Sequence, residues 1–197
     1  MPTDALLASL SRLTGDLHSA AVQWALIGGF AVSARAEPRF TRDVDVCVLV
    51  DDDAGAERTT YAMGGLGYRV EALIEHEYAD RLATVRLESP VTGGVLVDML
   101  FASSGIEPEV VAAAEALELV PGLVVPVARA AHLVVLKLLA RDASRPQDDM
   151  DLRALRAVLT AGDADDVRRL AALVTSRGFH RERDLMGLAE DYLRQSP

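Results

Sequence analysis

The stretch LIGGFAVSARAEPRFTRDVDVCVLV, residues 26–50, decides the fold of this chain. It opens on the end of a short apolar run, Trp24 to Ile27, which predicts a buried strand. The pair Gly28-Gly29 predicts a turn, and the small residues after it predict a helix that stops before Pro38, because a proline disfavours helical backbone in the residue before it. Residues 43–50 predict a second strand. The order is therefore strand, glycine turn, helix, strand.

The rest of the chain predicts strands first and helices afterwards. Apolar residues at helical spacing from Leu6 to Leu17 predict a first helix, and two more are expected over 56–63 and near 107–116. Strand-like runs recur at 68–73, 83–88 and 95–101, and the turn between the last two contains Pro90, which suggests an antiparallel pair. From Val127 onward the pattern is helical, with segments near 128–141, 148–160, 163–177 and 181–194.

These elements predict an α/β protein of the α+β kind. We expect a small mixed β-sheet core with helices in residues 1–126 and a C-terminal helical subdomain in residues 127–197. Half of the residues are apolar, which is enough for a sizeable core. No repeat or low-complexity linker divides the chain, so the two parts are expected to share an interface. A cleft between them is the expected place for a substrate.

The composition excludes several classes of protein. A net charge of −10 argues against broad, sequence-independent nucleic-acid binding, because an acidic surface repels phosphate backbones. The most apolar helical stretch, residues 130–140, is interrupted by His132 and Lys137 and is shorter than the about 20 residues that span a bilayer, so no membrane role is expected. Cys47 is the only cysteine, and no basic segment precedes an apolar block near the N-terminus, which indicates a cytoplasmic protein.

Two local clusters of basic residues remain as candidates for contact with a nucleotide or a nucleic acid. In the first, Arg42 lies next to the second strand and accompanies Arg35 and Arg39, so Arg42 is a candidate nucleotide-binding residue. For the second, the favoured interpretation is a solvated helix face; it consists of Arg177, His180, Arg181 and Arg183.

Three aspartates form the candidate catalytic group. Asp43 and Asp45 alternate along one strand, so both side chains point to the same face with Cβ atoms roughly 6 to 7 Å apart. Asp98 lies in a strand that could run beside the first. Carboxylates this close repel one another unless a cation neutralises them, and Mg²⁺ typically binds one or two carboxylates together with nucleotide phosphates. Strand ends are often acidic, so the spacing of Asp43 and Asp45 by itself is weak support.

Lys137 is the only lysine among 20 basic residues, and it lies within the apolar run HLVVLKLLA. A charge is costly to desolvate there, so the position requires an explanation. One is a functional ammonium; the other is a lysine whose alkyl stem packs on the core while its head reaches water.

Residues 26–50 resemble the signature of the DNA polymerase β-type nucleotidyltransferase superfamily. The features that match are a glycine pair, a short helix, and a strand in which two aspartates alternate with apolar residues; VLVDML, residues 95–100, resembles the strand with the third carboxylate. Within the superfamily, residues 127–155 are similar to the later motifs of AbiEii-type toxins, including mycobacterial tRNA-modifying toxins. In those motifs a helical lysine precedes an Asp-x-x-Asp helix start, which corresponds to Lys137, Asp148 and Asp151.

The resemblance implies roles for these residues. Asp43, Asp45 and Asp98 would hold Mg²⁺ or Mn²⁺, and the Gly28-Gly29 turn would approach the phosphates of an NTP. Lys137 would hold a triphosphate oxygen as a compact charge, and Asp148 or Asp151 would orient it or an acceptor group. The alternative for the aspartates near residue 150 is a helix N-terminus whose dipole favours acidic residues.

The sequence departs from the family pattern at two places. Gly29 replaces the serine that is common after the first glycine in many relatives. The segment PQDD, residues 146–149, lacks the basic residue often found before the motif aspartate. The contacts at both places are therefore open.

The resemblance implies a metal-dependent nucleotidyltransferase that moves an NMP from an NTP to an acceptor and releases pyrophosphate. The preferred acceptor is RNA, namely the 3′ end of tRNA, with a pyrimidine nucleotide such as CTP as donor and a cognate antitoxin protein as partner. A small-molecule nucleotidyltransferase of the aminoglycoside- or lincosamide-modifying kind is the rival enzyme. The rival of another class is an inactive member of the fold that acts as a binding module.

Thr41 is a candidate regulatory site, because it lies two residues before Asp43. Phosphorylation would add about two negative charges beside the aspartates and weaken binding of nucleotide and metal. The alternative, a β-branched residue at the start of a strand, is the favoured interpretation.

Overall fold

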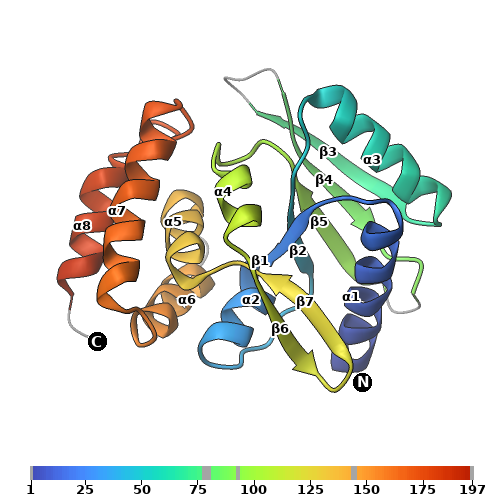
Figure 1. Cartoon of the computed structure of the whole chain (residues 1–197), viewed down its shortest axis with the longest axis horizontal. Coiled ribbons are helices and arrows are strands. Elements are labelled where there is room, and N and C mark those ends of the chain that lie inside the picture. The colour runs from blue at the N-terminus through green and yellow to red at the C-terminus, as the bar shows by residue number, and fades with distance from the viewer. Residues whose placement is uncertain (1, 77–80, 92–93, 143–145, 196–197) are drawn as a thin grey trace.

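In the computed structural model, which describes residues 2–76, 81–91, 94–142 and 146–195, a mixed sheet separates two sets of helices (Figure 1). Within these residues the sheet has seven strands, in the order β3-β4-β5-β2-β1-β7-β6. In chain order they are β1 (Trp24–Ile27), β2 (Val44–Val48), β3 (Arg69–His76), β4 (Arg81–Glu88), β5 (Leu96–Leu100), β6 (Glu115–Val120) and β7 (Leu123–Val127). The helices are α1 (Pro2–Ser19), α2 (Gly28–Arg35), α3 (Asp53–Gly65), α4 (Glu107–Ala112), α5 (Ala130–Ala140), α6 (Pro146–Arg156), α7 (Ala161–Ser176) and α8 (Leu185–Arg194).

The sheet is mixed at its centre. β2 pairs antiparallel with β1 and parallel with β5, while β4 pairs antiparallel with both β3 and β5. On the other side, β7 runs parallel to β1 and antiparallel to β6. This arrangement confirms the expected α+β class and the antiparallel pairing of the strands at 83–88 and 95–101.

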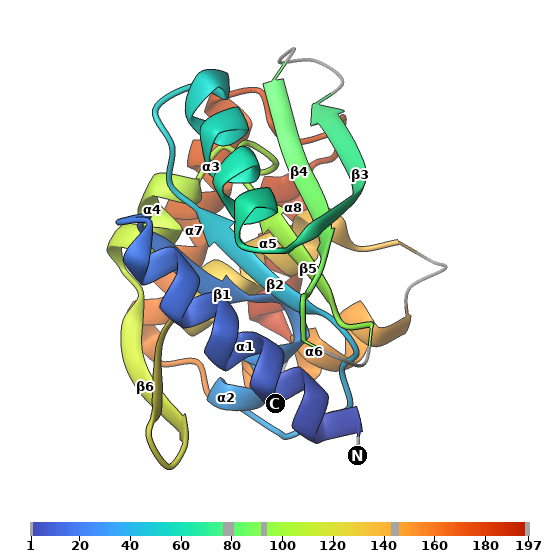
Figure 2. The same ribbon diagram turned by 90° about the vertical axis from the view of Figure 1, so that its right-hand side faces the viewer.

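The two faces of β2 have different surroundings. Figure 2 shows α1 and α3 in front of one face of the sheet, with α5, α7 and α8 behind the other. Val44, Val46 and Val48 are completely buried, as are the leucines of α1 that cover the sheet on their side, Leu10, Leu13 and Leu17. On the opposite face the Cys47 thiol donates to the carbonyl of Glu107 at the start of α4, 3.8 Å away. The alternation of this strand thus sends its aspartates toward the C-terminal helices.

The hairpin β6–β7 was not predicted. Residues 107–116 were expected to be one helix, but α4 ends at Ala112 and β6 begins at Glu115. Pro126 argues against a central strand, whereas the structure pairs β7 with β1 at Val127, one residue beyond the proline. Gly122, with φ +85°, makes the turn that closes the hairpin.

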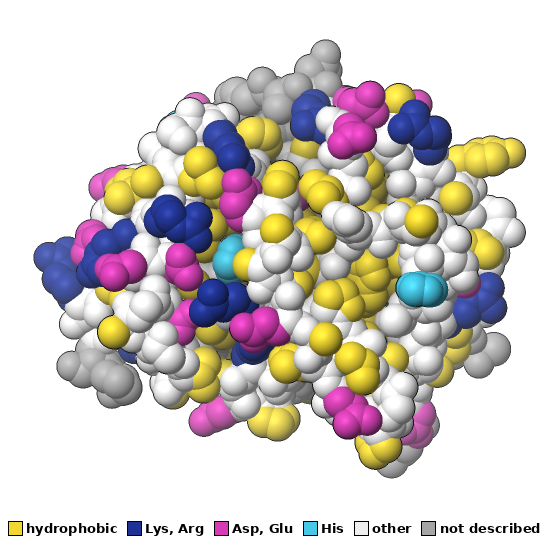
Figure 3. All heavy atoms as spheres, in the orientation of Figure 1, with side chains coloured by type: hydrophobic (Ala, Val, Ile, Leu, Met, Phe, Trp, Pro, Cys, Tyr) yellow, Lys and Arg dark blue, Asp and Glu magenta, His cyan; other side chains and the backbone are white. Residues whose placement is uncertain are grey.

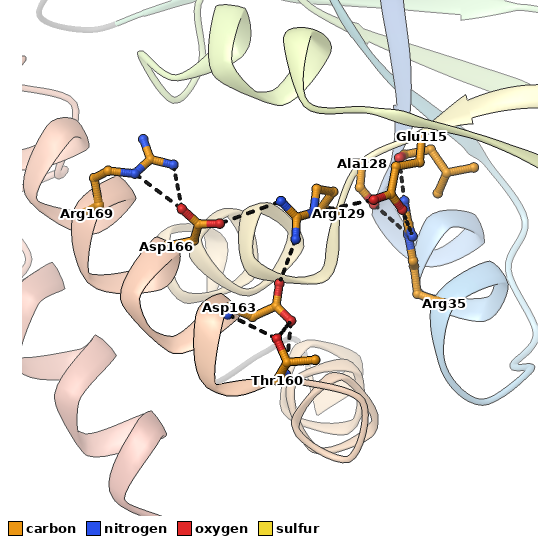
Figure 4. Close-up of polar contacts among 9 residues, drawn as sticks. Arg35, Glu115, Ala128, Arg129, Thr160, Asp163, Asp166 and Arg169 are labelled. Carbon is orange, nitrogen blue, oxygen red and sulfur yellow. Dashed lines mark hydrogen bonds and ion pairs between the residues drawn. The ribbon is translucent and has the colours of Figure 1, made fainter.

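A chain of ion pairs joins the sheet side of the molecule to α7 (Figure 4). Arg35 of α2 binds Glu115 of β6 at 2.5 Å and donates to the carbonyl of Ala128 at 3.0 Å. Arg129, just before α5, lies between Glu115 at 3.6 Å and Asp163 of α7 at 3.5 Å. Several of these groups are partly exposed, so each pair contributes only about 0–1 kcal/mol. The pairs link β6 to the start of α5 and to α7.

From Ala130 on, all the elements in the described part of the chain are helices. The boundary predicted near residue 126 falls between β7 and α5, and the assignment of 127–197 as a separate subdomain stays a prediction. Across the described residues, no helix combines the length and apolar character needed to cross a membrane.

We expect His132 to make the stability of the fold sensitive to acid. Its side chain is 2% exposed, and burial lowers the pKa of the imidazole from 6.5 to about 4. Between these values the unfolded chain binds a proton that the folded chain excludes, so stability falls as the pH decreases from 6.5 toward 4. Urea unfolding at pH 7 and pH 5 measures the loss, of which His132 should account for on the order of 1–2 kcal/mol.

The matched variant for this measurement is His132→Gln, which cannot take up the proton. Its free energy of unfolding should fall less between the two pH values than that of the wild type, whatever its stability at pH 7. Equal losses in the two proteins would show that His132 does not contribute.

Candidate active site

The glycine pair forms a corner between β1 and α2. Gly28 has φ +64°, a left-handed conformation, and a Cβ atom added to it would lie 1.9 Å from Oδ2 of Asp45. At Gly29 an added Cβ would lie 2.3 Å from Nη2 of Arg39. Ile27, the residue before the helix, provides no side-chain cap, so the first N–H groups of α2 have no capping partner from it. The corner therefore brings helix N–H groups next to a carboxylate and a guanidinium.

The three predicted carboxylates meet on one face of the sheet. Asp45 of β2 lies directly opposite Asp98 of β5 in the parallel register, and Asp43 immediately precedes β2. Burial, and then the charge of Asp98, raise the pKa of Asp45 to about 6. The same two causes raise the pKa of Asp43. These shifts indicate that the carboxylates are close enough to destabilise one another's charge.

Arg86 neutralises part of this charge. Asp98 accepts hydrogen bonds from its Nε at 2.8 Å and from its Nη2 at 2.7 Å, a bidentate pair across β4 and β5. Asp98 is the main cause that raises the pKa of the Arg86 guanidinium. Arg86 was missed in the sequence, although the predicted antiparallel pair carries the signal: the register places Arg86 opposite Asp98.

Lys137 is bound by both of the aspartates expected to orient it. Its Nζ lies 2.8 Å from Oδ1 of Asp148 and 2.7 Å from Oδ2 of Asp151. The lysine side chain is 14% exposed, and those of the two aspartates are 5% and 0% exposed. The ammonium therefore lies in a buried ion cluster, and the alternative of a lysine head that simply reaches water is wrong.

Arg39 completes this cluster; the sequence indicated it only as a member of the basic group with Arg35 and Arg42, without a partner. Its Nε and Nη2 donate to the two oxygens of Asp151 at 2.5 and 2.8 Å. The loop between α2 and β2 thereby contacts α6, 112 residues away in sequence. No local pattern predicts a partner at that separation. Arg39 and Lys137 both lower the pKa of Asp45, which places their charges near the catalytic candidates.

Arg42 and Thr41 lie on the same loop. Arg42 is exposed, stacks over the ring of Phe40 with its Cζ 5.7 Å from the centroid, and lowers the pKa of Asp43 through its charge. The Thr41 hydroxyl donates to the carbonyl of Asp43 at 3.4 Å. Both residues therefore lie beside the first aspartate, Arg42 as an exposed cation and Thr41 in the segment that leads into β2.

The donor chemistry of this site fits a hard divalent cation. Three carboxylates share one face, and the glycine corner leaves room for the carboxylate of Asp45. In the described residues, however, no group of three or more His, Cys, Asp or Glu side chains is already arranged as a metal-binding set. Both oxygens of Asp98 are engaged by Arg86. The Arg86 guanidinium thus neutralises the Asp98 carboxylate, as a bound metal cation would.

The fold is shared with nucleotidyltransferases of known structure. An antigenic nucleotidyltransferase-like protein from Paracoccidioides brasiliensis is 17% identical, with a TM-score of 0.57 over 95% of this chain and 93% of its own. The antibiotic-resistance factor ANT(2'')-Ia is 20% identical in its solution structure, with a TM-score of 0.56 over 90% of this chain and 94% of its own. Its crystal structure with adenylyl-2''-tobramycin gives 21% identity and a TM-score of 0.54, over 89% of this chain and 98% of its own.

Identities this low establish the fold alone, and no curated protein matches the chain by sequence. A family model is more specific. The model of the nucleotidyl transferase AbiEii toxins of type IV toxin–antitoxin systems matches residues 12–195. Because the match spans nearly the whole chain and includes the carboxylates, Lys137 and the aspartates that bind it, the chain belongs to the AbiEii family of nucleotidyltransferase toxins.

Proposed function

We propose that the chain transfers a nucleoside monophosphate from an NTP to the 3′ end of an RNA acceptor, with tRNA as the preferred acceptor and CTP as the expected donor. Membership of the family makes the protein a nucleotidyltransferase and implies an antitoxin as partner. The observation that carries the proposal is the register of Asp45 opposite Asp98, with Asp43 beside them and the Lys137 cluster facing Asp45.

Asp43, Asp45 and Asp98 are the residues that would hold divalent ions, Mg²⁺ or Mn²⁺. When bound, such ions supply charge neutralisation for the phosphates and for the leaving pyrophosphate. Asp98 would have to exchange at least part of its contact with Arg86 for this purpose. Burial and the charge of Asp98 raise the pKa values of Asp43 and Asp45, so a cation that stabilises their ionised forms is favoured electrostatically.

The other residues bind and orient the substrate in this proposal. Gly28 and Gly29 let the first N–H groups of α2 approach the phosphates, and Lys137, fixed by Asp148 and Asp151, meets a triphosphate oxygen. The acceptor hydroxyl oxygen forms a bond to the α-phosphorus while the bond from that phosphorus to the bridging oxygen breaks. Pyrophosphate leaves, and the hydroxyl proton passes to a carboxylate or to water.

A small-molecule acceptor is the second candidate. The fold is similar to that of ANT(2'')-Ia, which has been solved with an adenylylated tobramycin, and a net charge of −10 suits a cationic drug. An inactive binding module is disfavoured, because Asp43, Asp45, Asp98 and Lys137 are all retained and grouped. Incubating the pure protein with each labelled NTP and either total tRNA or a panel of aminoglycosides and lincosamides separates the candidates.

Replacement of a catalytic aspartate should abolish transfer. With Asp43→Asn, incorporation of labelled nucleotide into tRNA should fall by about a hundredfold or more, since a ligand of the divalent ion contributes several kcal/mol to the transition state. The matched control is Asp51→Asn, which removes an exposed carboxylate a few residues away. Full activity of the Asp43 variant would contradict the assignment, and labelling of a drug but not of tRNA would replace RNA by the second candidate.

Gly28→Ala should reduce transfer through Asp45. The added Cβ would collide with the Asp45 carboxylate, and the positive φ of residue 28 adds about 1–2 kcal/mol of strain. Gly122→Ala is the control, because Gly122 also has positive φ but has no atom within 4 Å of an added Cβ. We expect both variants to lose thermal stability, Gly28→Ala more because of the collision, and only Gly28→Ala to lose activity at a temperature at which both are folded. Equal activities would show that Gly28 does not act on Asp45.

Thr41 is proposed as a site of regulation by phosphorylation. A negative charge there would oppose binding of nucleotide and metal beside Asp43. Thr41→Glu should therefore lower activity at limiting NTP and metal, and saturating concentrations of both should recover part of it. Thr41→Val keeps the branched shape without charge and should remain active. Unchanged activity of Thr41→Glu would rule out this form of control.

A further inference from the structure

Arg39 is held in one orientation at the glycine corner. Two of its nitrogens donate to Asp151, and Nη1 donates to the carbonyl of Phe40 at 3.0 Å. The carboxylate that it binds is completely buried, and the arginine side chain is 22% exposed. A guanidinium fixed in this way is pre-organised, because its rotamer is set by a fork of two charge-assisted bonds.

The position of Arg39 explains why residue 29 is glycine. Unlike Gly28, Gly29 lies in a helix without a positive φ, and glycine destabilises a helix by about 0.5–1 kcal/mol relative to alanine. The obstacle to a side chain is the guanidinium itself: an added Cβ would lie 2.3 Å from Nη2 and 2.7 Å from Cζ of Arg39. Since Asp151 holds that group, it cannot move aside freely. The space taken by the Arg39 guanidinium therefore explains a glycine at this position of α2.

Arg39 and Lys137 form a pair of cations around one carboxylate. Asp151 binds Lys137 through Oδ2 and Arg39 through both oxygens. An ammonium has three donor hydrogens and a guanidinium has five. The contacts above engage two of the former and three of the latter, so three remain for a ligand within the described contacts. The two cations lie near Asp45. At the glycine corner, the Asp45 carboxylate is next to Gly28, and the Arg39 guanidinium is next to Gly29.

We propose that Arg39 is a second cation of the nucleotide site: positioned by Asp151 over Gly29, it binds the triphosphate together with Lys137 and selects NTP over NMP. This inference rests on the proposed function. A side chain at residue 29 would occupy the space of the Arg39 guanidinium. Because residue 29 is glycine, Arg39 can supply a hydrogen-bond donor to the glycine corner. The N–H groups of Arg39 that Asp151 and Phe40 do not engage can donate to phosphate oxygens, and the carboxylate of Asp151 holds both cations in place.

The test compares triphosphate with monophosphate binding. Isothermal titration of the full chain with NTP and with NMP, both with Mg²⁺, gives the ratio of the two affinities. Arg39→Gln should weaken NTP binding by about tenfold to a hundredfold, the usual effect of losing a charge-assisted bond, and change NMP binding by less than about threefold. A merely structural role would weaken both alike. Arg153→Gln, an exposed arginine on the same helix as Asp151, is the control and should leave both unchanged.

A double-mutant cycle tests the contact with Gly29. Gly29→Ala should weaken NTP binding because it displaces the guanidinium, and it should have little further effect in a chain that already carries Arg39→Gln. Arg39→Lys keeps a charge for Asp151 but loses the fork, so it should fold and give an intermediate ratio. This variant preserves the test if Arg39→Gln unfolds.

The outcomes also separate this inference from the proposed function. If the wild type binds NTP and labels an acceptor while Arg39→Gln and Arg39→Lys leave the ratio of NTP to NMP affinity unchanged, the assignment of Arg39 falls alone. If the wild type binds no NTP at all, both fall. A lowered ratio in the variants, with additive effects of Gly29→Ala and Arg39→Gln, would also overturn the proposed contact between residues 29 and 39.

Discussion

The parallel pairing of β2 with β5 is the constraint on which the site depends. It sets Asp45 opposite Asp98 on one face, with Asp43 next to them. Two unit charges 4 Å apart repel by about 4 kcal/mol at an effective dielectric near 20. The opposite face of β2 holds this arrangement in place, because Val44, Val46 and Val48 are completely buried there. A shift of the strand register by one residue would turn these valines away from the core. Packing thus holds together carboxylates that electrostatics would separate.

Arginine and lysine from three different directions compensate for this repulsion. Arg86 comes from the neighbouring strand β4, Lys137 from α5, and Arg39 from the loop after α2. Lys137 and Arg39 are themselves anchored by the buried carboxylate of Asp151, and removal of one partner from such a buried pair typically destabilises a protein by 3–5 kcal/mol. The helices after β7 are therefore bound to the core by the groups that also shape the site.

The parts of this site that could be predicted from the sequence are local ones. Asp43 and Asp45 follow from the alternation of one strand, the glycine corner from its place between strand and helix, and Lys137 from a charge in an apolar run. Asp98 followed from a predicted strand, but its partner Arg86 required the register of the hairpin as well. Arg39 was noted only as part of a basic cluster, and its contact with Asp151 could not be found this way, because the two residues are 112 positions apart. The hairpin β6–β7 was missed because Pro126 contradicts the usual strand pattern, and only the tertiary pairing at Val127 overrides it.

For the proposed RNA acceptor, an acidic protein offers few favourable contacts, and the structure limits where these can be. The cluster near residue 180 is engaged within the protein: Arg177 binds Glu109 and the carbonyl of Gly105, and Arg181 donates to the carbonyl of Ser103. These arginines fasten the loop after β5 to the connection between α7 and α8, which suggests a structural role rather than a solvated face. The basic surface at the left of Figure 3 also contains acidic neighbours. Arg42, exposed beside Asp43, has no such anchor in the described contacts except the ring of Phe40. Arg42 therefore places an exposed positive charge on the loop that leads into β2, where a local field can act on a phosphate despite a net charge of −10.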